Sequence, residues 1–241
     1  MEKYLELQQN IITTGNDKEG PGFIGKNRSL FSVDLSFDLN DGLPILTTNQ
    51  IDLGDVLTLI IKALNNIDNY PLPTFESGYC HHGFHKFLGF NQMYNLNTRN
   101  IPTSHMDSIR EEYRYKLPRT LTKEEFESKL PTMYLDIKVY QPTAEVFTEA
   151  ALDITFYSTL LMIFAERVNM IPRFVHWSCG HAYITKQNFS AVKNQLNRKP
   201  FKLPKLVING NVANIRDYTL NDFQLYGYES HTALVVNKEL V

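Results

Sequence analysis

Cysteine and tryptophan are the scarcest residues of this 241-residue chain, which has two cysteines, Cys80 and Cys179, and one tryptophan. Two cysteines are too few for the disulfide framework that stabilises small secreted domains. The chain also lacks an excess of charge of one sign, because it has 24 Lys and Arg and 26 Asp and Glu, a formal net charge of −2. Such a balance gives no global attraction for nucleic acid or anionic membranes, so we expect neither as a partner.

A long apolar run is missing as well. The first residues, MEKYLELQQNIITTG, mix charged and apolar side chains and do not resemble a signal peptide. The most apolar stretch, 150–165, is interrupted by Asp153, Thr155, Ser158 and Thr159, which argues against a membrane span. We therefore predict a cytoplasmic protein.

The overall composition is that of an ordinary globular protein, with 43% hydrophobic and 21% charged residues. The alternation of helical and strand-like segments predicts one α+β domain over residues 1–241. Residues 16–28 are expected to form a loop, and 70–130 give no clear prediction. Helices are expected at 2–14, 53–66, 145–167 and 185–197, and strands at 29–39, 132–141, 173–184, 205–209 and 223–228.

Several segments, in order along the chain, resemble one enzyme family. FDLNDGLPILTT (37–48), QPTAE (141–145), GHAYITKQNF (180–189) and NDFQLYGYESH (221–231) are similar to motifs of the thymidylate synthases and pyrimidine hydroxymethylases. The resemblance implies a thymidylate-synthase-like fold with a large mixed sheet, through which two copies form a homodimer. It also implies a pyrimidine nucleotide as ligand and methylenetetrahydrofolate as a possible cofactor.

The nucleophile of this family is a cysteine in a P-C-(H/N) motif, one β-hairpin before a Q-R-S motif. Here the stretch before Gln141 has no cysteine; only Leu130-Pro131 could remain of the motif, with Thr132 or Met133 in place of the thiol. Neither side chain can replace a thiolate as nucleophile and leaving group. The sequence therefore predicts that the standard methylation chemistry is lost.

The two cysteines present carry different hypotheses. Tyr79-Cys80-His81 copies the nucleophile motif at another place, so Cys80 is a candidate relocated nucleophile. Cys179 lies on an expected buried strand, where a core residue is the simpler interpretation.

The groups that would bind phosphate are also altered. The arginine of Q-R-S is replaced by Pro142, which cannot form the two hydrogen bonds of a guanidinium group. The remaining candidates are Lys18, Lys26 and Arg28, and Arg119 in place of the arginine pair that the resemblance assigns to the partner subunit. Ordinary surface charge is the alternative for each.

Two acidic positions differ from the family pattern. Its catalytic glutamate falls near Leu59, on a helix with no acidic residue between Asp55 and Asp68. The network for general acid–base catalysis therefore loses its carboxylate. The folate-side aspartate becomes Glu145.

Other binding residues survive. Asp153 takes the place of the asparagine that reads the pyrimidine edge, as in the cytosine-directed hydroxymethylases, and a carboxylate can accept a hydrogen bond from the exocyclic amine of cytosine. The alternative is a helix-face aspartate satisfied by local partners. The predicted nucleotide-binding residues are Gln141, Thr143, Asp153, His181, Tyr183 and Tyr228.

A metal site is a third hypothesis. Cys80, His81 and His85 lie in the run C-H-H-x-x-H, and on a helix His81 and His85 would share a face, as zinc ligands require. Against this, glycines flank the run and no nearby residue completes the ligand set.

The leading interpretation is a diverged relative, with a bacteriophage as one candidate source, that keeps a pyrimidine nucleotide or nucleoside pocket without the cysteine chemistry. An active one-carbon transferase using Cys80, and a zinc protein on the same scaffold, are the alternatives.

Overall fold

The computed structural model describes residues 1–18, 26–65, 81–87 and 90–235, and the side chains of 81–93 are not part of the description. The predictions for Cys80, and for the side chains of His81 and His85, lie outside the described residues.

A six-stranded mixed sheet forms the centre of the molecule, in the order β1-β2-β6-β5-β4-β3. All neighbours are antiparallel except β5 and β6, which are parallel and joined by the crossover helix α5. The strands are β1 (Asn16–Lys18), β2 (Asn27–Asp38), β3 (His81–Phe87), β4 (Phe90–Asn100), β5 (Met133–Glu145) and β6 (Ile171–Thr185). A separate two-stranded ribbon pairs β7 (Lys205–Ile208) with β8 (Phe223–Tyr226).

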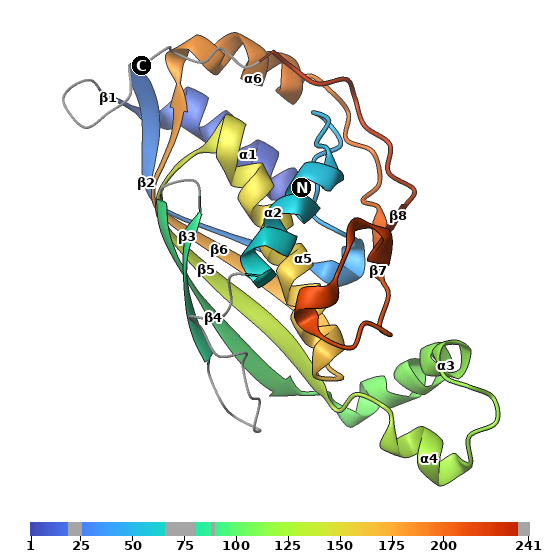
Figure 1. Ribbon diagram of the computed structural model, residues 1–241. Helices are drawn as coiled ribbons and strands as arrows, with labels where there is room; N and C mark the ends of the chain where they lie inside the picture. Colours follow the sequence, from blue (N-terminus) through green and yellow to red (C-terminus); the bar gives the residue numbers. More distant parts are fainter. Residues whose placement is uncertain (19–25, 66–80, 88–89, 236–241) are drawn as a thin grey trace.

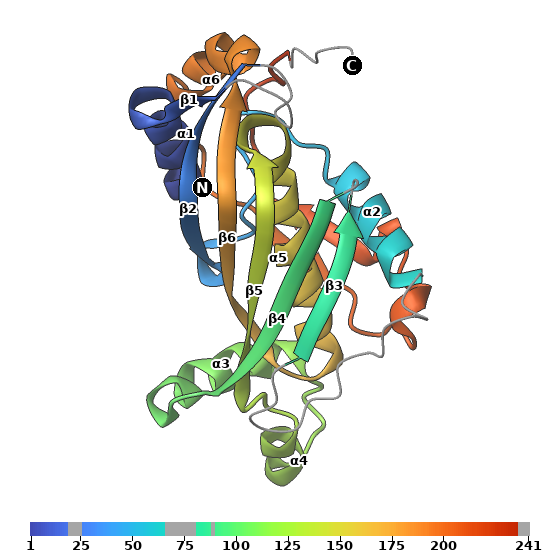
Figure 2. The same cartoon turned by 90° about the vertical axis from the view of Figure 1, so that its left-hand side faces the viewer.

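One face of the sheet is covered by helices and the other is open (Figures 1 and 2). The covering helices are α1 (Glu2–Thr14), α2 (Leu53–Asn65), α5 (Ala151–Arg167) and α6 (Phe189–Leu196). α3 (Met106–Lys116) and α4 (Lys123–Ser128) project from the end of the sheet that lies away from β1 and α6 (Figure 1). Single helical turns lie at η1 (Leu39–Asp41), η3 (Thr103–His105), η4 (Val146–Ala150), η5 (Lys186–Asn188), η6 (Ile215–Asp217) and η7 (Leu220–Asp222).

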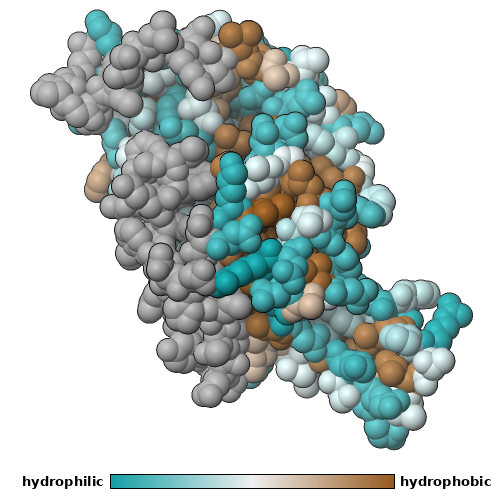
Figure 3. Space-filling view, in the orientation of Figure 1, coloured by the Kyte–Doolittle hydropathy of each residue, from teal (hydrophilic) through white to brown (hydrophobic). Residues whose placement is uncertain are grey.

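The central helix α5 is buried on nearly all sides, because the sheet and α2 enclose it. Of its 17 residues, 13 are buried. With the π-helical turn before it, Val146–Arg167 is long and apolar enough to cross a membrane, but 78% of the window is buried inside the protein. This is the burial expected of a core helix. On the surface seen in Figure 3, hydrophobic and hydrophilic residues are interspersed.

The predicted α+β class is confirmed, and nine expected helices and strands lie where the periodicity placed them, within a few residues at their ends. One prediction was wrong. Part of the expected loop 16–28 forms β1 and the start of β2, because these segments pair as an antiparallel hairpin. In the segment 70–130, which carried no clear prediction, the structure describes β3, β4, α3 and α4.

A kink crosses the three central strands. Three residues that lie side by side have no ladder partner: Ser32 of β2, Gly180 of β6 and Pro142 of β5. The residues before and after each of them are paired across the sheet. Ser32 has a left-handed φ of 57°. A Cβ on Gly180 would lie 2.8 Å from the Pro142 carbonyl oxygen, so the strands approach closely only because residue 180 has no side chain.

The kink changes which residues face the core. Before it, Gln141 and Cys179 are buried; after it, Ala144 and Ala182 are. The phase of the alternation therefore shifts by one residue. Because of this shift, odd-numbered positions face the core just before the kink and even-numbered positions face it just after. The odd-numbered positions after the kink are therefore available to the candidate site.

Candidate functional site

The candidate site lies where β5 ends and turns into α5. Gln141 and Asp153 are 2% and 3% exposed. Gln141 Nε2 donates to Asp153 Oδ2 over 2.7 Å, and Gln141 Oε1 accepts from Trp177 Nε1 over 2.8 Å. These two hydrogen bonds connect Trp177 of β6, Gln141 of β5 and Asp153 of α5 in one line.

Cys179 lies beside this line, paired in register with Gln141. Its thiol is buried, and burial raises its pKa to about 12, with Asp153 adding to the effect. The expected core position of Cys179 agrees with this burial. Since only a tiny fraction of such a thiol is ionised near neutral pH, Cys179 is a poor nucleophile.

Past the kink, His181, Tyr183, Thr143 and Glu145 share one face of the sheet. Thr143 and His181 are paired, as are Glu145 and Tyr183. Thr143 Oγ1 donates to the His181 carbonyl oxygen over 3.2 Å, and the rings of His181 and Tyr183 stack with centroids 5.9 Å apart. Residues directly opposite on neighbouring strands point the same way, so these four side chains form one polar surface.

The electrostatics of this surface reflect its burial. Burial lowers the pKa of His181, with Lys18 adding to the effect. Burial, then Glu149 and Glu145, raise the pKa of Tyr183 to about 12. Burial raises the pKa of Glu149, although the hydrogen bond from the Glu145 backbone N–H opposes this rise. Glu149 was not identified from the sequence; its position four residues after Glu145, in the turn leading to α5, is the signal that could have revealed it.

Glu145 is fully used by its own neighbours. Its Oε2 accepts from Thr148 N (2.7 Å) and Thr148 Oγ1 (2.9 Å), and its Oε1 accepts from Thr185 N (3.1 Å) and Thr185 Oγ1 (3.4 Å). The carboxylate thus caps the π-helical turn and fixes the end of β6. These four bonds do not fit a side chain that holds a folate, so its folate-side role stays a prediction without support from this geometry.

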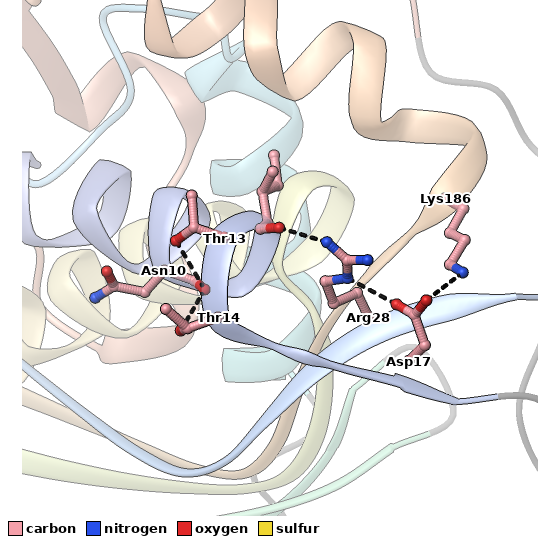
Figure 4. Close-up of polar contacts among 7 residues, drawn as sticks. Asn10, Thr13, Thr14, Asp17, Arg28 and Lys186 are labelled. Carbon is pink, nitrogen blue, oxygen red and sulfur yellow. Dashed lines mark hydrogen bonds and ion pairs between the residues drawn. The ribbon is translucent and has the colours of Figure 1, made fainter.

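A basic cluster lies at the edge formed by β1, β2 and η5. Figure 4 shows Asp17 between Arg28 Nε, at 2.7 Å, and Lys186 Nζ, at 2.6 Å. These hydrogen bonds lower the pKa of Asp17 to about 2. Arg28 also donates to the carbonyl oxygen of Ile12 at the end of α1, over 2.6 Å. Arg28 is therefore held by the fold.

Two more lysines belong to this edge. Lys18 lies on β1, and the Lys26 carbonyl oxygen accepts from Lys186 N over 2.9 Å. Two positive charges, those of Arg28 and Lys186, thus contact the Asp17 carboxylate, and Lys18 and Lys26 lie on the neighbouring backbone. Lys186 was missed by the sequence reasoning, although it follows the H-x-Y motif by three residues.

A buried amide lies within the same cluster. Asn27 is 0% exposed, and neither its Nδ2 nor its Oδ1 has a hydrogen-bond partner in the part of the chain that is described. Its pairing partners are Lys18 on one side and Thr185 on the other. Buried polar atoms are almost always satisfied in native proteins.

Other predicted residues lie apart from this site. Arg119 is exposed between α3 and α4, at the other end of the molecule (Figure 1). The Tyr228 hydroxyl donates to the Leu46 carbonyl oxygen over 2.8 Å and accepts from Ile51 N over 3.1 Å, which fixes the loop before α2. Leu59 is part of α2 and packs against the core.

The expected remnant of the nucleophile motif is also displaced. Met133 begins β5 and Gln141 lies eight residues further along it. At about 3.3 Å per residue, roughly 26 Å separate them. The strand that precedes β5 in the hairpin is β4, whose Met93 pairs with Tyr140. The interpretation of Thr132 or Met133 as the replaced nucleophile was therefore wrong: they lie at the far end of the strand.

The metal hypothesis loses its helical spacing. His81–Phe87 is a strand, so the Cα atoms of His81 and His85 are about 13 Å apart instead of one helical turn. Among the residues that the structure describes, no group of three or more His, Cys, Asp or Glu could hold a metal ion.

Comparison with known proteins decides the family. The sequence profile of thymidylate synthase matches residues 97–238. Thymidylate synthase of Mycoplasma mobile is 28% identical over 284 residues, covering 97% of this chain and 98% of that protein. The chain belongs to the thymidylate synthase family. Because the aligned length exceeds that of the chain, the relative has segments that this family member lacks.

Proposed function

We propose that this thymidylate synthase family member binds a pyrimidine deoxynucleotide or nucleoside, with cytosine preferred, and does not carry out cysteine-dependent methylation. The observation that supports the pocket is the buried line of hydrogen bonds from Trp177 through Gln141 to Asp153, beside Cys179. A buried carboxylate held in this way can meet the amine of a cytosine.

The phosphate of such a ligand would bind at the basic cluster. Lys18 pairs with Asn27 in the β1–β2 ladder, and Lys186 follows Thr185, the partner of Asn27 in β6. Within the described part of the chain the Asn27 amide has no hydrogen-bond partner, and an anion with several acceptor oxygens would accept from its N–H group. The stacked rings of His181 and Tyr183 follow Cys179, the ladder partner of Gln141, along β6 and precede Lys186; in this proposal a sugar lies beside them and connects phosphate and base.

The second part of the proposal, that the protein does not carry out cysteine-dependent methylation, rests on the absence of a suitable thiol. No cysteine lies between Cys80 and Cys179, so β4 and β5 have none. The pKa of about 12 keeps Cys179 protonated. The one remaining route to the family reaction is Cys80 acting as a relocated nucleophile.

The test measures binding and turnover separately. We expect calorimetry to show binding of dCMP, weakened at least about tenfold in Asp153→Ala, since a lost polar contact at a base edge costs about 1–3 kcal/mol. With methylenetetrahydrofolate and C5-tritiated dCMP or dUMP, we expect no tritium release. Release that disappears in Cys80→Ala would establish the active-transferase alternative, and absence of any nucleotide binding would refute the pocket.

We also propose that the chain is a single folding unit and forms a homodimer through the open sheet face. The open face is formed by the strands of the sheet (Figure 2). On β2 and β5, Phe31 is 84% and Tyr140 40% exposed, and Lys138 and Asp34 form an ion pair between these strands. Sedimentation velocity should give a dimer that Tyr140→Lys weakens; a monomer at all concentrations would contradict this proposal.

A further inference from the structure

The buried indole of Trp177 determines how the amide of Gln141 is oriented. An indole N–H can only donate, so the atom of Gln141 facing it must be the carbonyl oxygen. The amide nitrogen is then forced toward Asp153, at 2.7 Å from Oδ2. A flipped amide would oppose N–H to N–H at Trp177 and oxygen to carboxylate at Asp153, two repulsive contacts in a buried site.

The same chain of contacts restricts Asp153. Its Oδ2 accepts from Gln141 Nε2, and this hydrogen bond helps to fix the orientation of the carboxylate. A carboxylate oxygen opposite position 4 of a pyrimidine attracts the amine of cytosine and repels the carbonyl oxygen of uracil. The burial of all three side chains leaves little freedom to rearrange, because Trp177 is 0%, Gln141 2% and Asp153 3% exposed.

We propose that Trp177 is a positioning residue that sets the cytosine-over-uracil preference of the pocket through Gln141 and Asp153. This inference depends on the proposed nucleotide binding. Trp177 does not contact the ligand in this scheme; it acts on specificity by fixing the amide that holds the carboxylate.

The test is a ratio of affinities. Calorimetry with dCMP and with dUMP should give a wild-type preference for dCMP of at least about tenfold. Trp177→Phe keeps an aromatic ring and removes the N–H, and Gln141→Met keeps the length and removes both hydrogen bonds. Each should reduce the dCMP-to-dUMP preference at least about fivefold. Phe164→Leu is the matched control for loss of core packing, because Phe164 lies about 16 Å from Asp153 along α5. It should leave the dCMP-to-dUMP ratio unchanged.

A measurement on the unmodified protein covers the case in which the variants do not fold. Trp177 is the only tryptophan, so a ¹⁵N-labelled sample gives a single indole N–H resonance. We expect dCMP to shift this resonance more than dUMP does. An unchanged resonance at saturating dCMP, or a folded Trp177→Phe protein with the wild-type ratio, would overturn the positioning role.

The two proposals fail differently. If neither nucleotide binds to the wild-type protein, the proposed function itself is refuted. If dCMP binds with a clear preference that Trp177→Phe and Gln141→Met retain, the pocket stands and the role of Trp177 is refuted.

Discussion

Removing the carboxylate of Glu145 should loosen the junction between β5, β6 and α5. This side chain is 5% exposed and accepts four hydrogen bonds from Thr148 and Thr185, two of them from backbone N–H groups. In Glu145→Ala the hydroxyls can rotate to other partners, but the two backbone donors lose their acceptor inside the protein.

The expected cost follows from these contacts. Hydrogen bonds to a charged group contribute about 1.5–3 kcal/mol, and a buried donor left without a partner costs about 1–3 kcal/mol. With partial hydration of the Thr148 N–H at the start of a helical turn, a loss of about 3 kcal/mol in the free energy of unfolding is a reasonable sum. At about 2–4 °C per kcal/mol for a chain of this size, Tm should fall by about 6–12 °C.

Thermal and urea unfolding followed by circular dichroism would measure this. Glu145→Gln retains one acceptor oxygen and should lose about half as much. Glu6→Ala, on the exposed face of α1, is the matched control and should change Tm by less than about 1 °C. A Glu145→Ala protein within about 2 °C of wild type, with folate affinity reduced, would show that Glu145 serves a ligand and not the fold.

Three further outcomes are expected. In the folded protein the pKa of the Asp17 carboxyl is about 2, below its usual 3.8, so its ion pairs stabilise the fold above about pH 4 and this contribution is lost as pH falls through 2. Asp17→Asn should remove that part of the acid dependence of Tm. An unchanged profile of Tm against pH would count against the pairing of Asp17 with Arg28 and Lys186. In a Cys80→Ser protein, Cys179 should react with a thiol reagent at pH 7.5 only after denaturant is added, because burial raises its pKa to about 12; rapid native labelling would contradict this. Gly180→Ala should lower the urea midpoint by an amount equivalent to about 1–3 kcal/mol, since the new Cβ would lie 2.8 Å from the Pro142 carbonyl oxygen; a neutral effect would mean that the kink can relax.

The helix and the strand that carry the candidate residues could be found from the sequence because local periodicity identifies them. Asp153, His181 and Tyr183 were assigned from the resemblance to family motifs; the structure places them on α5 and β6, and their binding roles stay predictions. Lys186 and Glu149 were missed, since a lone lysine or glutamate outside a motif looks like surface charge.

The hairpin before β5 shows where sequence reasoning ends. Strand β4 is joined to β5 by a long connection that contains α3 and α4, so its partner cannot be recognised from nearby residues. Pairing between distant segments depends on which strands bury their faces together, and a single sequence does not record that. For this reason Thr132 and Met133 were placed at the wrong end of β5.

The sequence by itself determined the α+β class, most helices and strands, and the absence of cysteine from β4 and β5, because these depend on local periodicity and residue identity. Only the tertiary structure decided that Glu145 caps a turn, that Arg28 is held by Asp17 and Ile12, and that Trp177 orients Gln141 toward Asp153. Hydrogen-bond partners far apart in the chain are chosen by packing, when burial leaves each donor a single acceptor within reach.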